Sequence, residues 1–195
     1  QSAATAQSRF RHAQDDELAP KRLDLTLAVE GQTELASKII SELVGNRYEC
    51  DICFNTIRRS VAVWSCNHCH SIFHVVCAKK WAKSARDPNA PPNAPIGRWH
   101  CPKCRHGHDG VPNSWCFCGK VKDPANDPMK VPHSCGDVCL KSRSGTTCPH
   151  TCPLQCHPGP CPPCASMGPL KHCWCQRATY RLRCGQHDEG QTCGY

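Results

Sequence analysis

The sequence predicts a small zinc-stabilised protein, mostly irregular, with short helices and hairpins in place of a large apolar core. The 195 residues include 20 cysteines and 12 histidines but only four phenylalanines and two methionines, so apolar burial cannot be the main source of stability. The cysteines and histidines fall in closely spaced groups, which is typical of tetrahedral zinc sites. The opening residues are polar and lack the apolar stretch of a secretory signal, which favours zinc over disulfides.

The formal charge of +8 is weak evidence for nucleic-acid binding. Zinc binds cysteine as thiolate, and about five Zn²⁺ ions on ionised cysteines would bring the net charge to about zero. No stretch approaches the roughly 20 apolar residues of a membrane span, so we expect no membrane partner and a reduced compartment, the nucleus or the cytoplasm. Two local basic groups remain of interest: Lys79, Lys80 and Lys83, and Arg177, Arg181 and Arg183.

The N-terminal part divides at residue 22. Residues 1–22 are polar and charged, which is typical of a disordered lead-in. In residues 23–47, apolar residues first alternate with polar ones, which predicts a short extended segment ending at Gly31. The spacing over 33–45 then predicts an amphipathic helix. We expect this helix to pack on the zinc module behind it, with a partner-binding helix as the alternative.

Residues 48–105 form the first zinc module, with four ligand pairs that each enclose two residues. Each pair forms a tight knuckle that holds one face of an ion, so eight ligands make two tetrahedral sites. Two further histidines, His68 and His70, lie close enough to compete. A helix carrying Trp81 is expected over 75–85, and four prolines predict a loop over 87–98. The pairs are Cys50 and Cys53, Cys66 and Cys69, His74 and Cys77, and Cys101 and Cys104.

The four pairs resemble the RING and PHD finger families, in which pairs one and three share one ion and pairs two and four share the other. The resemblance implies a cross-braced module with Cys50, Cys53, His74 and Cys77 on the first zinc and Cys66, Cys69, Cys101 and Cys104 on the second.

Four residues that bind no metal resemble the RING positions that dock a ubiquitin-conjugating enzyme: Ile52, Trp81, Pro102 and Arg105. The resemblance implies an E3 ubiquitin transferase with ubiquitin and its conjugating enzyme as partners. Such a module has no covalent catalytic residue; it positions the charged enzyme, and its zinc sites are closed and structural. Trp99 is instead a PHD-like feature and supports a protein-interaction finger.

Residues 106–114 are predicted to be a linker, and residues 115–195 carry a denser array. The unit H-x-C-x3-C begins at His133 and again at His150, which is an internal repeat. Spacing does not assign ligands to ions, and His172 is interpreted as a bystander. The predicted ligands suffice for roughly three or four sites: Cys116, Cys118, His133, Cys135, Cys139, Cys148, His150, Cys152, Cys156, His157, Cys161, Cys164, Cys173, Cys175, Cys184, His187 and Cys193. The prolines of 157–164 predict a rigid metal-bound knuckle.

The order of motifs over about residues 33–195 resembles the NFX-type zinc-finger family. The motifs are Trp64-Ser65-Cys66, Trp99-His100-Cys101-Pro102, Cys116-Phe117-Cys118-Gly119-Lys120, Pro132-His133-Ser134-Cys135-Gly136 and Cys156-His157-Pro158-Gly159-Pro160-Cys161. The resemblance implies a RING-type finger followed by an array of NFX-type knuckles and about five or six structural zinc ions. It also implies a fragment, truncated before later fingers and an RNA-binding domain.

Two functions follow from this resemblance. The first is a ubiquitin ligase whose array recruits a protein or ribonucleoprotein substrate or nucleic acid. The alternative is a sequence-specific DNA-binding transcriptional regulator whose first module is a PHD-like protein-interaction finger. The array lacks the long helix that reads a major groove, and a solvated basic face is the plainer interpretation of the best DNA or RNA candidates, Arg177, Tyr180, Arg181 and Arg183.

Overall fold

The computed structural model describes residues 23–85, 96–143 and 148–184. The lead-in, most of the proline loop and the predicted ligands His187 and Cys193 lie outside these residues. The elements are α1 (Leu25–Val29), α2 (Glu34–Val44), β1 (Val63–Ser65), β2 (Ile72–His74), α3 (Val75–Ser84), β3 (Arg98–His100), β4 (Gly107–Asp109), β5 (Lys171–His172) and β6 (Thr179–Tyr180). The strands form three antiparallel pairs, β1–β2, β3–β4 and β5–β6. This small, mostly irregular architecture confirms the predicted fold class.

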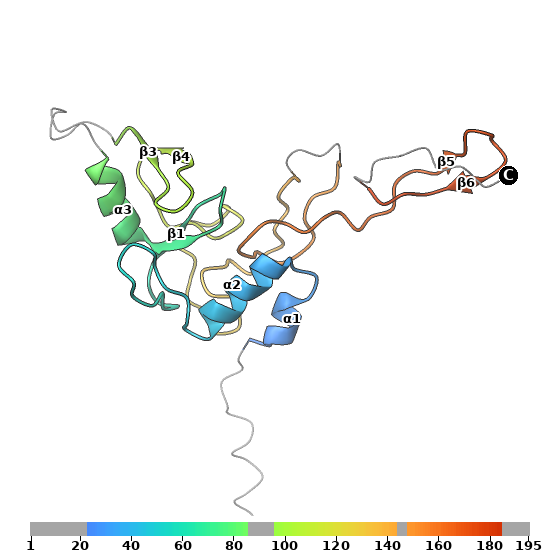
Figure 1. Ribbon diagram of the computed structural model, residues 1–195. Helices are drawn as coiled ribbons and strands as arrows, with labels where there is room; N and C mark the ends of the chain where they lie inside the picture. The colour runs from blue at the N-terminus through green and yellow to red at the C-terminus, as the bar shows by residue number, and fades with distance from the viewer. Residues whose placement is uncertain (1–22, 86–95, 144–147, 185–195) are drawn as a thin grey trace, which may run out of the picture.

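The elements are spread along an elongated molecule (Figure 1). The helix α3 and the β3–β4 pair lie at one end, and α1 and α2 lie in the middle. The β5–β6 pair lies at the far end of an extended arm. The first zinc module and the tip of the array are therefore well separated.

The short helix α1 replaces the extended segment expected before Gly31. Asp24 caps it, because its carboxylate accepts hydrogen bonds from the N–H groups of Thr26 at 2.9 Å and Leu27 at 3.4 Å. Leu27 is 69% exposed, so the alternating leucines do not line a buried strand face. The extended interpretation was wrong because a local N-cap and packing on α2 outweigh a short alternating pattern.

The helix α2 occupies the residues where the apolar spacing predicts one. The Thr33 hydroxyl accepts a bond from the Ala36 N–H at 3.2 Å, and Gly45 closes the other end by donating to the Ser41 carbonyl at 3.0 Å. Its buried residues Ile39 and Ile40 join the main core with the first zinc module. The helix thus contributes to the fold of that module.

Three aromatic side chains pack together in the first module. Trp64 on β1 lies 5.0 Å from Trp99 on β3 and 5.8 Å from Phe73 on β2, measured between ring centroids. Trp99 is 1% exposed, and its indole N–H donates to the Gly110 carbonyl at 2.9 Å. That bond and the β3–β4 pairing use residues 107–110, so the segment predicted as a linker begins as a strand. Composition missed it because the Cys101–Cys104 knuckle reverses the chain and makes β4 pair with β3.

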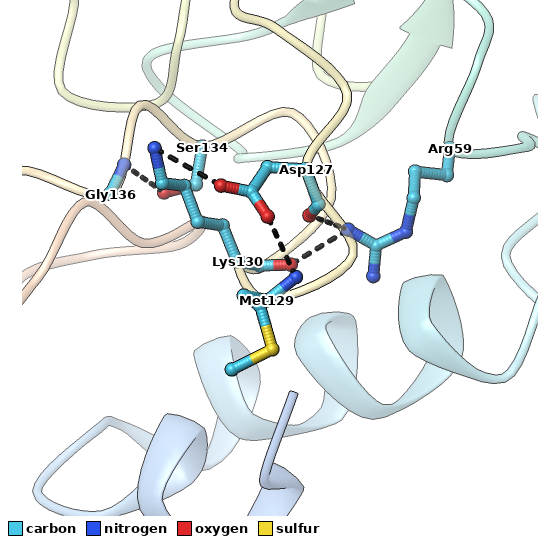
Figure 2. Close-up of polar contacts among 6 residues, drawn as sticks. All are labelled: Arg59, Asp127, Met129, Lys130, Ser134 and Gly136. Atoms are coloured by element: carbon cyan, nitrogen blue, oxygen red, sulfur yellow. Dashed lines mark hydrogen bonds and ion pairs between the residues drawn. The ribbon is translucent and has the colours of Figure 1, made fainter. Parts of the chain in front are cut away.

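The two zinc regions are also joined away from this segment. One guanidinium nitrogen of Arg59 donates to the backbone carbonyls of Asp127 and Lys130, each at 2.7 Å (Figure 2). The Asp127 carboxylate accepts from the Met129 N–H at 2.9 Å and pairs with the Lys130 ammonium at 3.4 Å. Arg59 therefore holds a self-braced loop of the array against the first module.

Candidate metal centres

Five groups of four cysteine or histidine side chains come together among the described residues. In each group the donor atoms all lie within 4.8 Å of one another. We number the clusters one to five along the chain: Cys50, Cys53, His74 and Cys77; Cys66, Cys69, Cys101 and Cys104; Cys116, Cys118, Cys135 and Cys156; Cys139, Cys152, His157 and Cys161; Cys148, His150, Cys164 and Cys184.

The spacing of the donors fits zinc. Zn–S bonds of about 2.3 Å in a tetrahedron place two sulfurs about 3.8 Å apart. The Cys66 and Cys104 sulfurs are 3.8 Å apart, and those of Cys139 and Cys161 are 3.9 Å apart. Four sulfurs, or three sulfurs and one imidazole, are the donor sets of closed structural zinc sites. The prediction of about five or six structural zinc ions is confirmed, with five sites among the described residues.

Clusters one and two have the interleaved pairing that the RING and PHD resemblance implied. His74 ends β2 directly before α3, and strand pairing with Val63 fixes its place. Its Nδ1 lies 3.3 Å from the Cys53 sulfur and 3.9 Å from the Cys77 sulfur. Cys66 and Cys69 lie in sequence between the two ligand pairs of cluster one but belong to cluster two. The chain must therefore form both sites together.

The three C-x2-C knuckles share one type of backbone turn. The residue after the second cysteine has a positive φ and donates its N–H to the carbonyl of the first cysteine, at 2.8, 2.9 and 3.1 Å in Phe54, His70 and Arg105. The C-x-C knuckles of the array repeat this turn at Gly119 and Gln176. Non-glycine residues rarely adopt this conformation, so metal binding and the local hydrogen bonds maintain it.

The two H-x-C-x3-C units of the array pack antiparallel. Cys135 of the first unit shares cluster three with Cys156 of the second, while Cys139 shares cluster four with Cys152. Two backbone bonds of 2.7 Å hold this arrangement, from Cys139 to Leu154 and from Cys156 to Asp137. Spacing alone could not find this pairing because it crosses between the units.

The proline-rich knuckle that begins at His157 contributes this histidine and Cys161 to cluster four. The His157 Nδ1–H donates to the Pro158 carbonyl at 2.9 Å, while Nε2 lies 3.5 Å from the Cys152 sulfur. The Nδ1 bond selects the tautomer that leaves Nε2 free for a metal. His157 and Pro158 are both buried, so the ring is held in one orientation.

Several predicted or competing ligands join none of the clusters formed by the described residues. His133, the counterpart of His150, is buried with a positive φ, its Nε2 has no partner, and burial lowers its pKa to about 4. Cys173 and Cys175 place their sulfurs 3.6 Å apart in a separate pair. His68 stacks on His106 at 4.6 Å and His70 is half-buried. His172, the bystander, is exposed on β5.

Sequence reasoning missed an outer contact of cluster two. His108 on β4 places Nε2 3.4 Å from the Cys66 sulfur and packs edge-on against Trp64 at 5.0 Å. Burial raises the pKa of the Cys66 thiol to about 12, and binding of a metal ion releases that proton. The His108 tautomer that carries its proton on Nε2 can donate to the resulting thiolate and stabilise it. Its position in an apparent linker gave no signal of this role.

Two of the four residues predicted to dock a conjugating enzyme make contacts within the first module itself. The Trp81 indole N–H donates to the His100 carbonyl at 2.9 Å, and Ile52 packs against the core. Pro102 is half-buried in its knuckle, and Arg105 is exposed at the left-handed position after Cys104. Ile52 and Trp81 therefore have a structural reason, whereas nothing in the structure explains an arginine at position 105.

No family model matches the chain. It is 42% identical over 164 residues, 83% of the chain, to the "Transcriptional repressor NF-X1 homolog" of Dictyostelium discoideum. It is 36% identical over 96% of the chain to the "NF-X1-type zinc finger protein NFXL1" of Arabidopsis thaliana, and 36% over 94% to the "FKBP12-associated protein 1 homolog" of Schizosaccharomyces pombe. The chain spans only 10%, 17% and 16% of these relatives.

The prediction of an E3 ubiquitin transferase was wrong. The relatives are named as a transcriptional repressor and as zinc-finger proteins, which points to transcription regulation and not to a ligase. Ubiquitin and a conjugating enzyme consequently lose their support as partners. The resemblance misled because Ile52 and Trp81 also make contacts within the zinc module itself. Within the described residues, no helix has the length and apolar character to cross a membrane.

Proposed function

Because the chain belongs to the NF-X1-type zinc-finger family, we propose that it is the DNA-binding part of a nuclear transcriptional regulator. The array supplies the DNA contact, and the first module acts as a protein-interaction finger. The relative named as a transcriptional repressor supports the regulatory part of this proposal. The observation that carries the DNA contact is the combination of an exposed tryptophan and excess positive charge on the β5–β6 arm.

The charge of the array is concentrated toward its C-terminal end. No aspartate or glutamate occurs between Asp137 and Asp188. Clusters four and five each contain three cysteines and one histidine, so each has one net negative charge with Zn²⁺ bound, and an excess of about four positive charges remains. The cations of this stretch are Lys141, Arg143, Lys171, Arg177, Arg181 and Arg183. Such an excess favours a polyanionic partner.

Trp174 adds a planar surface to this charge. It lies between Cys173 and Cys175 in the turn that joins β5 to β6, and it is 96% exposed. Arg177 and Arg181 are exposed on the same hairpin. Aromatic rings beside cations are the usual means of holding a nucleic-acid strand without a groove-reading helix, because bases stack on the ring while cations hold phosphate.

The described part of the array, residues 115–143 and 148–184, contains no helix. A helix in the major groove is therefore not the mode of contact that these residues offer. The arm in Figure 1 instead presents a narrow hairpin at the end of the molecule. This hairpin contacts the phosphates of the DNA and exposed base or sugar surfaces.

The salt dependence of DNA binding tests this proposal. We expect the zinc-loaded chain to bind a labelled duplex with a clear salt slope, and the double variant Arg177→Ala, Arg181→Ala to lower that slope by about 2. We expect Trp174→Ala to weaken binding of this duplex less than binding of the same strand unpaired, because paired bases leave no free face for the indole ring.

The matched control removes two charges from α3 at the other end of the molecule, in Lys80→Ala, Lys83→Ala, both residues being exposed. Its slope should stay close to that of the unmodified chain. A salt slope near zero for the unmodified chain would show that it makes no phosphate contacts. An equal decrease of the slope in both double variants would show that the β5–β6 arm is not the contact surface.

A further inference from the structure

We propose that a hollow between the first zinc module and the array binds an unpaired nucleobase. The hollow has a volume of about 360 Å³, within the range of small-molecule sites. One wall comes from residues 65–70 of the first module, and the other from residues 115–119 and 157–159 of the array. The inference rests on the proposed function, because the basic array brings the strand to this site.

Trp115 gives the hollow a stacking surface. Its side chain is 46% exposed although Cys116, which follows it, is buried. It also lines a second hollow of about 200 Å³ with Trp64 and Asn113. A half-exposed indole that borders two hollows offers the flat face on which a base of any sequence can stack.

The polar groups of the hollow suit a neutral base better than an anion. No carboxylate lines it. Cys66 and Cys116 line it and belong to four-cysteine clusters, each of which has two net negative charges with Zn²⁺ bound. A phosphate inside would be repelled, whereas the Ser65 hydroxyl and the Asn67 amide can donate to and accept from a base edge.

A cation is nevertheless available for the phosphate that accompanies the base. Lys141 is an exposed residue of the array that lines the same hollow. With the base against Trp115, the attached phosphate can remain in solvent beside this ammonium group. Lys141 lies in the stretch without carboxylates that also includes the β5–β6 arm, so the hollow and the arm can contact one strand.

The walls of the hollow are preformed. His70 is fixed in the left-handed conformation by its N–H bond of 2.9 Å to the Cys66 carbonyl. On the other side, Gly159 packs against Ala36 of α2 so closely that an added Cβ would lie 3.0 Å from the Ala36 Cβ. A base therefore enters a site that needs little ordering.

The test compares one strand in two forms on the zinc-loaded chain. The probes are a fluorescein-labelled oligothymidylate of about 12 nucleotides and the same strand annealed to its complement. We expect Trp115→Ala to weaken single-strand binding about 5- to 150-fold and to change duplex binding less than about twofold. Trp115→Phe should retain most of the single-strand affinity. Deoxyribose and ribose versions of the strand then distinguish DNA from RNA as the source of the base.

Two measurements guard against a structural explanation. Met129→Ala removes another side chain that is 45% exposed and lines neither hollow, so it should leave both affinities unchanged, and zinc content should be the same in all variants. A strand carrying 5-iodouracil should, on irradiation, form an adduct with Trp115 that mass spectrometry locates.

The outcomes separate this inference from the proposed function. Equal effects of Trp115→Ala on single strand and duplex, no effect on either, or adducts found only at Trp174 would overturn the base site while leaving the arm in place. If the arm variants and salt leave duplex binding unchanged but Trp115→Ala still weakens single-strand binding, the proposed function fails and the base site stands.

Discussion

The guanidinium of Arg59 lies 2.7 Å from the backbone carbonyl oxygen of Lys130, 71 residues further along the chain. With the matching bond to Asp127, it links the first zinc module to the array. We expect Arg59→Ala to lower the free energy of unfolding by about 1.5–3 kcal/mol, since a charged donor is lost from partly buried acceptors. Chemical denaturation in zinc-buffered solution would measure this. Arg58→Ala, at an exposed neighbour, should change stability by less than about 0.5 kcal/mol; equal losses would argue against the link.

Gly159 and Gly119 provide a matched pair for testing the contact between α2 and the array. Both have positive φ, +79° and +82°, but only Gly159 faces a neighbour, Ala36, within 4 Å of an added Cβ. Each change to alanine has a backbone cost of about 1–2 kcal/mol. We expect Gly159→Ala to cost about 1–3 kcal/mol more because of the clash, as measured by unfolding. Ala36→Gly removes only the Cβ contact and leaves the Ala36 Cα at 3.1 Å from the added Cβ, so it should recover only part of the loss. Equal costs at the two glycines would contradict the contact.

Phe54 tests the left-handed residue of the zinc knuckles. It has φ +58° and is 76% exposed, so its side chain contributes little packing that a substitution could remove. Phe54→Gly should therefore raise the free energy of unfolding by up to about 1 kcal/mol, whereas Phe54→Val should lower it by about 1–2 kcal/mol. The comparison uses thermal unfolding of the zinc-loaded forms. If Phe54→Val were more stable than Phe54→Gly, the side chain and not the backbone conformation would set stability at this position.

Zinc counting by native mass spectrometry tests the antiparallel pairing of the repeat units. Cys135 and Cys156 contribute to one cluster, whereas Cys135 and Cys139 contribute to two. The double change Cys135→Ser, Cys156→Ser should therefore release about one ion, and Cys135→Ser, Cys139→Ser about two. The two variants remove the same number of thiols, so each is the control of the other. The reverse order would mean that each unit binds its own ion.

The sequence was informative where local chemistry decides the structure. The helix α2 could be predicted because Thr33 and Gly45 delimit an apolar period, and ligand types could be predicted because knuckles have short, fixed spacing. By contrast, α1 depends on one capping carboxylate, Asp24, and on a neighbouring helix. The strand β4 depends on a reversal enforced by the Cys101 knuckle.

The grouping of clusters one and two was implied by the RING and PHD resemblance, whereas in the array most ligands were predictable but their grouping was not. His133 and His150 hold the same position in the repeat, yet His150 joins cluster five and His133 is buried apart from the clusters. The spacing to the two cysteines that follow is identical, but Cys148 lies two residues before His150 and shares its cluster, whereas Val131 holds that place before His133. The roles of Trp115 and Trp174 could not be predicted from the sequence, because both depend on exposure of the indole ring at the folded surface.

The interleaved clusters also decide where this polypeptide can be divided. Cluster one spans Cys50 to Cys77 and overlaps cluster two, and the spans of clusters three, four and five overlap continuously from Cys116 to Cys184. A cut anywhere inside either span separates ligands of at least one ion. Among the described residues from Cys50 to Cys184, only the stretch between Cys104 and Cys116 can be severed with all five coordination sets intact. Protease resistance of the zinc-loaded chain, and the design of shorter fragments, should follow that boundary.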